Sequence, residues 1–321
     1  MFGIPDLRVF PDPYIGIDAD RAKGMLLAER FVDTDFEGLI AFYYANTKAV
    51  PAKDAARFTR GVLSATARAQ AALDWWSRES SLLDGSEPGK LLEIGCGTAP
   101  LLCAAAALGV KGVGIDIAFR WLVVGKKRLS EAGVNAPLIC SCAEALPFPD
   151  ETFDHLAADS VVEVVRSQTG AMAEAWRVLG PGGDAFLATP NRFSLGPDPH
   201  TGLWAGGYLP AAWSAAYARR RGAVPPQRQL LSARSLVGLL EKSGFAKVRA
   251  SLPDVAMGQR AHLSRGLNVV ISVYHTAKRL PVIRDAVFQV GPTFNALAEK
   301  DPGSPPTHAA VSAVTAMKGS Q

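Results

Sequence analysis

The stretch from Leu91 to Ala99 constrains the fold more than any other part of the chain. An apolar run, Leu-Leu-Glu-Ile, leads into Gly-Cys-Gly-Thr-Ala, and a helix is predicted to begin at Pro100. A second apolar run ends in Asp116, 21 residues after Gly95. A strand, a glycine turn, a helix and a second strand ending in an acid are typical of a doubly wound α/β domain. Such a domain holds a nucleoside-bearing cofactor at this corner.

Two residues of this corner favour one kind of cofactor over another. A dinucleotide-binding turn carries a third glycine, and Pro100 stands at that position. Glu93 would lie against a pyrophosphate, where like charges repel each other. A cationic ligand with an α-amino group and a sulfonium would instead be attracted to this carboxylate. The corner therefore argues against a nicotinamide oxidoreductase, the main alternative among enzyme classes.

From these residues, the chain resembles the class I methyltransferases that use S-adenosylmethionine, whose first motif reads acid-x-Gly-x-Gly-x-Gly. Ala99 replaces the last glycine of that motif. Segments 142–154 and 177–183 are similar to further motifs of the family, and the resemblance covers about residues 88–190 and 232–252. It implies a doubly wound, seven-stranded and mostly parallel Rossmann-like sheet, with S-adenosyl-L-methionine as cofactor.

The resemblance also implies which residues bind the cofactor. Asp116 is expected to accept hydrogen bonds from the ribose hydroxyls. Many relatives bind the adenine amino group through an aspartate at position 142. Because Cys142 is a poor acceptor, adenine is expected to be held by shape and backbone, or by Glu144. The implied set consists of Glu93, Gly95, Cys96, Gly97, Asp116, Ile117, Cys142, Ala143, Glu144 and Ser160.

Composition limits the partners and the compartment. The 34 basic and 30 acidic residues give a net charge of +4, too small to argue for a nucleic-acid partner. The basic runs 126–128 and 219–221 are interpreted as solvated faces. Four cysteines imply no disulfide framework, so a reducing cytoplasm is expected. A zinc site among them is disfavoured, and no metal is expected. No run has the length of a signal peptide core or a membrane span.

The chain is divided into a helical cap at 1–86, a methyltransferase domain at 87–300 and a disordered tail at 301–321. In the cap, one helix is predicted to follow a capping box at Thr34, and one longer helix to follow Pro51. His155 is expected to be exposed. The predicted strands of the domain are 90–95, 110–115, 136–141, 153–159, 183–189, 245–252 and 294–300, the last a reversed edge strand. The predicted helices are 99–108, 118–132, 168–179 and 232–243.

Two insertions are expected to set the specificity. Segment 191–231 follows the fifth strand, and loops at the carboxyl ends of strands line the ligand crevice of open α/β sheets. Its Trp204, Tyr208 and Trp213 form either an aromatic wall for the acceptor or the insertion's own small core. Segment 256–292 mixes apolar runs with basic residues. It is interpreted as a substrate cap, as helices packed on the core, or as a peripheral membrane contact.

Methyl transfer from a sulfonium is an in-line displacement, so alignment alone lowers the barrier by about 7–11 kcal/mol. The candidate catalytic residues are therefore few. His200 has the pKa range of a general base, and Asp198 could orient it. Glu163 is either a base or a cap for the following turn. In the family, an aromatic residue such as Tyr43 closes the pocket and faces the sulfonium.

The predicted function is methyl transfer to a small-molecule acceptor, on an oxygen of a secondary metabolite, lipid or glycan precursor. A methyltransferase that works at a membrane surface on a lipid or isoprenoid is one alternative. A catalytically silent protein that only binds the cofactor is another, because Ala99 and Cys142 depart from the family pattern.

Overall fold

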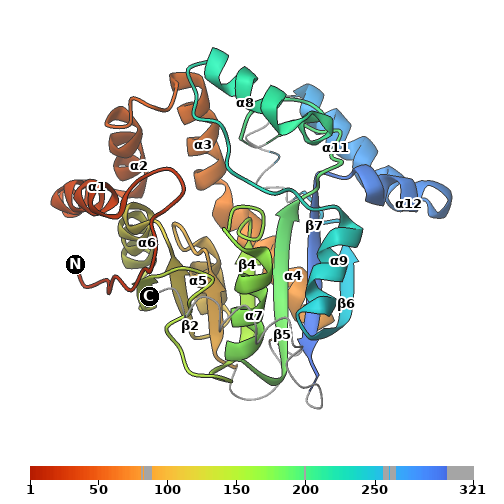
Figure 1. Ribbon diagram of the computed structural model, residues 1–321, viewed down its shortest axis with the longest axis horizontal. Coiled ribbons are helices and arrows are strands. Elements are labelled where there is room, and N and C mark those ends of the chain that lie inside the picture. Colours follow the sequence, from red (N-terminus) through yellow and green to blue (C-terminus); the bar gives the residue numbers. More distant parts are fainter. Residues whose placement is uncertain (81, 83–88, 199, 256–259, 261–264, 302–321) are drawn as a thin grey trace.

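The computed structural model describes residues 1–80, 82, 89–198, 200–255, 260 and 265–301 (Figure 1). A seven-stranded sheet forms its centre, in the order β3-β2-β1-β4-β5-β7-β6. Only β7 pairs antiparallel with its neighbours. The predicted doubly wound, mostly parallel fold is confirmed. The strands are β1 (Leu91–Ile94), β2 (Gly112–Asp116), β3 (Leu138–Cys140), β4 (Phe153–Asp159), β5 (Leu179–Pro190), β6 (Phe245–Ser251) and β7 (Thr293–Lys300).

Helices cover both faces of the sheet and one of its ends (Figure 1). The bounds before β4 are α1 (Ile17–Glu29), α2 (Phe36–Ala45), α3 (Ala52–Leu63), α4 (Ala65–Glu79), α5 (Pro100–Ala107) and α6 (Phe119–Glu131). Those after β4 are α7 (Gln168–Val178), α8 (Ala211–Arg220), α9 (Ala233–Lys242), α11 (Arg265–Ala277) and α12 (Pro281–Val290), with a short 3-10 helix at Gly206–Tyr208.

The apolar strand residues explain why helices cover both faces of the sheet. β1 pairs with β2 on one side and β4 on the other, and all four of its side chains are buried. On one face, Leu73 and Trp76 of α4 pack with Phe186 of β5. On the other face, Trp176 of α7 and Leu236 of α9 pack in a second core. The continuous apolar runs of the sequence are thus buried parallel strands.

Two predictions about secondary-structure elements and one about side-chain exposure are wrong. The helix after Pro51 breaks at Ser64 into α3 and α4, where the Ser64 hydroxyl donates to the Gly61 carbonyl. The last strand is reversed but is not an edge, since β7 lies between β5 and β6. His155 is buried and its Nδ1 lies 2.9 Å from Asp184 Oδ1, because β4 is an inner strand.

The basic runs are also less solvated than predicted. Arg128 is buried, and its guanidinium donates to the Thr66 and Thr98 hydroxyls. Arg221 pairs with the buried carboxylate of Asp54 at 3.2 Å. Each run therefore contributes one arginine that links the N-terminal helices to the rest of the domain.

The N-terminal segment is joined to the sheet directly. The Leu7 amide donates to the Cys140 carbonyl, and the Cys140 amide donates to the Pro5 carbonyl, both at 2.8 Å. This segment therefore runs alongside β3 before α1 begins. The predicted tail lies outside the described residues, except for Asp301. Among the helices that the structure describes, none has the length and apolarity needed to cross a membrane.

Candidate active site

The turn after β1 has no room for a side chain at Gly95 but has open space at Gly97. Gly95 has φ +69°, and a Cβ there would lie 2.2 Å from Val161 Cγ2. Gly97 has φ +48°, and a Cβ there would have Asp116 Oδ2 at 3.8 Å as its nearest atom. Ala99 takes φ +56° without being glycine and caps α5. The backbone at Gly97 is therefore the accessible part of this corner.

Asp116 ties this turn to the end of β2. Its Oδ2 accepts from the Gly97 amide at 2.9 Å, and its Oδ1 accepts from the Ala118 amide at 2.7 Å. Burial raises the pKa of Asp116 to about 6. Each carboxylate oxygen retains acceptor capacity beyond one hydrogen bond. The carboxylate can therefore accept further hydrogen bonds, and its contact with a ribose stays a prediction.

Glu93 shows that the corner suits a cation. The residue is 4% exposed, and its Oε2 has no hydrogen-bond partner among the described residues. Burial raises the pKa of Glu93 well above its usual value, and the charge of Asp159 raises it further. A buried carboxylate oxygen without a partner is costly. A bound ammonium or sulfonium would offset that cost, so the residues present fit the predicted cofactor.

The predicted adenine side is packed more tightly than the sequence suggested. The Cys142 thiol is buried and lies 3.6 Å from the Phe10 carbonyl. Glu144 Oε1 accepts from the backbone amides of Arg166 at 2.7 Å and Ser167 at 3.2 Å. The Glu144 carboxylate thus fixes the loop before α7, which counts against a role for it in holding adenine. Ala143, beside it, is buried.

The remaining predicted cofactor residues surround the same corner. The Cys96 amide donates to the Ile115 carbonyl at 2.8 Å, so it is not free for a ligand. The Ile117 carbonyl accepts from Arg8 Nη1 at 3.0 Å. Ser160 is exposed at the end of β4 with φ +61°, and its hydroxyl donates to Asp159.

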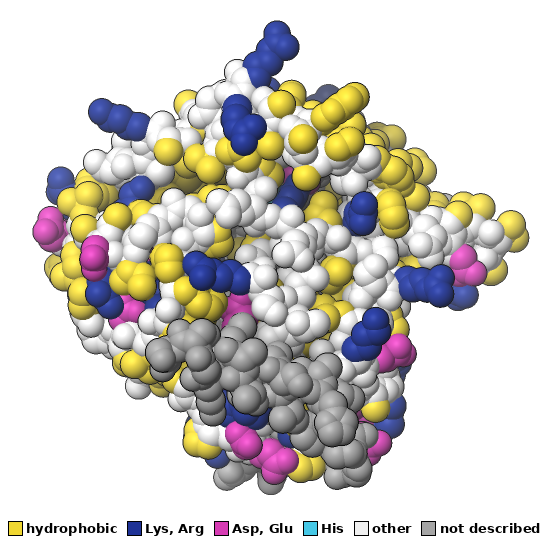
Figure 2. Space-filling model, in the orientation of Figure 1, with side chains coloured by type: hydrophobic (Ala, Val, Ile, Leu, Met, Phe, Trp, Pro, Cys, Tyr) yellow, Lys and Arg dark blue, Asp and Glu magenta, His cyan; other side chains and the backbone are white. Residues whose placement is uncertain are grey.

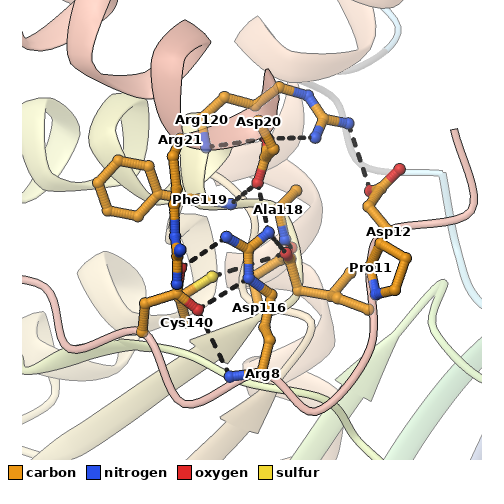
Figure 3. A network of polar contacts seen from close by, with 12 residues as sticks. Arg8, Pro11, Asp12, Asp20, Arg21, Asp116, Ala118, Phe119, Arg120 and Cys140 are labelled. Carbon is orange, nitrogen blue, oxygen red and sulfur yellow. Dashed lines mark hydrogen bonds and ion pairs between the residues drawn. The ribbon is translucent and has the colours of Figure 1, made fainter. Parts of the chain in front are cut away.

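A buried ion network beside this corner had not been predicted (Figure 3). Asp20 of α1 accepts from Arg8 Nη1 at 2.7 Å and from Arg120 Nη1 at 2.6 Å. Arg120 also pairs with Asp12 at 3.3 Å. The Asp20 side chain is fully buried, so the network holds segment 6–12 against the end of β2. Arg120 lies about 100 positions from Asp20 and Asp12, so these contacts leave no local signal in the sequence.

Tyr43 belongs to the packing around this network. Its ring lies 4.5 Å from that of Trp121 between centroids and 4.9 Å from that of Tyr44. Its hydroxyl accepts from Arg120 Nε at 3.4 Å, and Lys23 Nζ lies 4.8 Å from the ring centroid. Tyr43 therefore packs beside the ion network. Contact of its ring with a sulfonium stays a prediction.

Glu163 is a buried carboxylate between the ends of β4 and β5. It is 1% exposed, and its Oε2 accepts from the Thr189 hydroxyl at 3.0 Å. Its Oε1 has no hydrogen-bond partner among the described residues. Burial raises the pKa of Glu163 from 4.5 to about 7. The side chain does not cap the following turn, and its pKa suits proton transfer near neutral pH.

His200 lies in an arginine-centred cluster within the first insertion. Its Nδ1 is 3.1 Å from Arg228 Nη1, and Arg228 Nη2 donates to Asp198 Oδ2. Asp198 Oδ1 accepts from the His200 amide at 2.9 Å, so Asp198 orients the backbone rather than the imidazole. Burial, together with the charge of Arg228, lowers the pKa of His200 to about 4. A neutral imidazole that accepts from an arginine is a weak base.

Arg228 connects the two predicted bases. Its charge acts on both Glu163 and His200, and the adjacent Gln229 amide donates to the Glu163 carbonyl at 2.6 Å. A cavity of about 160 Å³ lies beside the cluster, between the end of β5 and the insertion. Asp198, Asn191 and Leu230 are among its lining residues. The cavity is therefore lined largely by residues of the first insertion.

The aromatic residues of that insertion do not form a closed core. Trp204, Tyr208 and Trp213 are at least half exposed, although the Tyr208 ring lies 5.4 Å from that of Phe193. Among the described residues, no group of three His, Cys, Asp or Glu side chains could hold a metal ion. The four cysteines are free thiols.

Comparison with known proteins identifies the central part of the chain. Residues 92–187 match the family model described as a methyltransferase domain. A demethylmenaquinone methyltransferase of Listeria monocytogenes serotype 4a is 34% identical over 113 residues, which are 34% of this chain and 48% of that protein. A ubiquinone/menaquinone biosynthesis C-methyltransferase of a Shewanella species is 34% identical over 119 residues, 35% of this chain and 47% of that protein. The chain spans about half the length of these curated relatives.

Among solved structures, a possible histamine N-methyltransferase from Thermotoga maritima is 18% identical, with a TM-score of 0.43, over 66% of this chain and 83% of that one. The predictions of family and cofactor are confirmed by the matched domain and its relatives, and the sheet order agrees with them. Residues 92–187 are thus a methyltransferase domain, and the chain is similar over this part to the class I S-adenosylmethionine-dependent methyltransferases.

Proposed function

We propose that the chain transfers a methyl group to a carbon atom of an apolar, hydroxylated ring, with Glu163 as general base. The observation that carries the proposal is the buried Glu163 carboxylate, which has one free oxygen and a pKa of about 7. One relative that matches this domain is named a demethylmenaquinone methyltransferase, and another a ubiquinone/menaquinone biosynthesis C-methyltransferase. The oxygen acceptor expected from the sequence has no such support.

Carbon methylation explains why a base is needed. A ring carbon becomes a good nucleophile when a hydroxyl on the same ring loses its proton. S-adenosylmethionine, when bound, supplies an electrophilic methyl group whose transfer leaves a neutral thioether. Glu163 Oε1 would take the hydroxyl proton, which makes the ring carbon nucleophilic toward that methyl group. After the methylated carbon has lost its C–H proton to solvent, Glu163 would return its proton to the ring oxygen, so that one proton is released in total. A base with a pKa near the working pH is efficient in this role.

In the proposed site, the donor end around Asp116 and Glu93 binds the cofactor, and the acceptor end around Glu163 binds the substrate. Asp116 would accept from the ribose hydroxyls, and Glu93 would face the positive charge of the donor. Glu163 would hold the proton at the acceptor end. Glu93 and Glu163 are both nearly fully buried, which strengthens the electrostatic interactions that each would make with a bound ligand. This arrangement supports turnover rather than silent binding.

The test uses donor labelled with carbon-13 on the methyl group and a reduced, short-chain demethylated naphthoquinone. NMR of the product is expected to show the label bonded to a ring carbon. The Glu163→Gln variant should lower turnover by about 10²–10⁴-fold and leave donor affinity unchanged in calorimetry. Glu241→Gln, an exposed substitution of the same kind on α9, is the matched control.

Two outcomes would contradict the proposal. Label on an oxygen would identify a different acceptor atom, and wild-type turnover in the Glu163→Gln variant would remove the base. Donor binding without methyl transfer to any quinol would favour the silent alternative.

A further inference from the structure

We propose that α8, α11 and α12 form a docking surface for a bilayer that contains anionic lipids. The inference rests on the surface of the two insertions and not on the acceptor proposed above. This surface is called the insertion face here, and it comprises α8, α11, α12 and residues 203–209.

The sheet topology brings both insertions to one end of the molecule. The first insertion leaves the end of β5 at Pro190, which is paired with Thr293 at the start of β7. The second leaves the end of β6 at Ser251, which is paired with Asn295. Both therefore stand beyond the carboxyl ends of the parallel strands, at the end that holds the candidate active site. Figure 1 shows α8 and α11 at the top and α12 projecting from the body at the right.

The insertion face exposes large apolar side chains. Val282 of α12 is 94% exposed, and the structure buries none of the residues of α12. Figure 2 shows apolar side chains gathered over α8, α11 and α12 with few acidic ones among them. A contiguous exposed patch of this kind marks a protein or membrane contact. Its exposed members include Trp204, Tyr208, Leu209, Trp213, Tyr217, Val269, Val270, Val273, Leu280, Val282 and Ile283.

The charge of the insertions is strongly asymmetric. Segments 191–231 and 256–292 carry ten Lys and Arg residues against only Asp198 and Asp285. The rest of the chain carries 24 basic against 28 acidic residues. The net positive charge of the protein thus comes from the insertions. Asp198 is buried against Arg228, and Asp285 pairs with Arg284, so neither offers an uncompensated negative charge.

The positive charge of the insertion face favours an anionic bilayer over a second copy of the chain as its binding partner. A second copy of the chain would bring two positive faces together, which is unfavourable. An anionic bilayer accepts apolar side chains among its headgroups and attracts the surrounding Lys and Arg residues. Exposed Trp and Tyr residues are also typical of the membrane–water boundary. An open groove of about 570 Å³, lined by Val269, Val273, Leu280 and Ile283 among others, leaves room for part of a lipid chain.

Co-sedimentation of the full chain with vesicles tests this inference without donor or acceptor, so its failure is independent of the proposed chemistry. One set of vesicles is phosphatidylcholine alone, and the other contains about 30% phosphatidylglycerol. Binding is expected only to the anionic set, and to weaken severalfold when NaCl rises from about 0.1 M to about 0.5 M.

Matched variants locate the contact. Val282→Asp is expected to weaken binding at least about tenfold. Val32→Asp introduces the same change at a site 88% exposed in the N-terminal cap and should have no effect. Arg284→Glu should weaken binding by about tenfold, whereas Lys111→Glu, at the opposite end of the sheet, should not.

The inference is overturned if the wild-type chain ignores anionic vesicles, or if Val282→Asp loses no more binding than Val32→Asp. Sedimentation velocity measures whether the chain forms a dimer through this surface instead. A dimer that dissociates on Val282→Asp, with no vesicle binding, would make a second copy the occupant. Circular dichroism of each variant distinguishes loss of binding from loss of fold.

Discussion

The donor end and the acceptor end of the site are built in different ways. At the donor end, the β1 turn and Asp116 come from one continuous βα unit, and the ion network around Asp20 fixes the N-terminal segment against it. At the proposed acceptor end, Glu163 comes from the turn after β4, whereas Arg228 and His200 come from the first insertion. The donor end is thus set by the family fold, and the acceptor end by what this chain adds to it.

Because of this difference, we expect affinity for the donor and specificity for the acceptor to depend on different residues. A donor corner built from the fold can be shared among many methyltransferases, since all require the same cation in the same place. The acceptor changes from one enzyme to another, and long loops at the carboxyl ends of strands are where such changes are tolerated. The predictions below test whether the two ends act separately, beginning with the largest effect.

Asp20→Ala should cost about 3–5 kcal/mol of unfolding free energy. The substitution leaves the guanidinium groups of Arg8 and Arg120 without their shared buried partner. Asp18→Ala on the same helix removes a carboxylate that is 99% exposed, and it should change stability by less than about 0.5 kcal/mol. Urea denaturation of both variants provides the comparison. Equal losses would mean that the network does not hold the N-terminal segment.

Glu163→Gln should become more stable relative to wild type as the pH rises from about 5 to 8. Because the folded-state pKa of Glu163 is raised from 4.5 to about 7, stability present below the unfolded pKa is lost as the pH rises through 7. The full difference is about 3 kcal/mol. Thermal or urea unfolding across this range measures it. A constant difference between the two proteins would show that Glu163 does not titrate as proposed.

Asp116→Ala should weaken donor binding by about 1–3 kcal/mol. The variant loses the ribose acceptor and also the hydrogen bonds that hold the Gly97 and Ala118 amides. Calorimetry with S-adenosylmethionine measures the change. Binding to wild type should also weaken as the pH falls below about 6, where Asp116 becomes protonated. Unaltered affinity would remove Asp116 from the donor site.

His200→Gln should slow turnover by less than about threefold, because a pKa near 4 makes the imidazole a weak base. Steady-state rates at saturating donor measure the effect. A loss as large as that of Glu163→Gln would make His200 of the insertion a candidate for the base and contradict the proposed role of Glu163.

The sequence predicted the fold well for a physical reason. Strand, turn and helix around Gly95 are local, and their periodicity and glycine spacing reflect contacts between near neighbours. The reversed last strand followed from the family resemblance, but its inner position in the sheet depends on β6, which pairs from the other side.

What the sequence did not predict depends on distant contacts. The network around Asp20 joins residues about 100 positions apart. Glu144 was one of two alternatives for holding adenine, and nothing in the sequence indicated that its carboxylate accepts from amides 22 and 23 positions away. His200 has the intrinsic pKa of a base, and only the burial and the nearby Arg228 revealed by the structure lower it.

Paired pH profiles of one enzyme test the central claim, that separate carboxylates serve the donor and the acceptor. Donor affinity should fall below about pH 6 with Asp116, and turnover at saturating donor should fall below about pH 7 with Glu163. In the Glu163→Gln variant, the inflection of turnover near 7 should disappear while that of donor affinity near 6 persists. A single shared inflection, or one near 7 that survives in the variant, would contradict the claim.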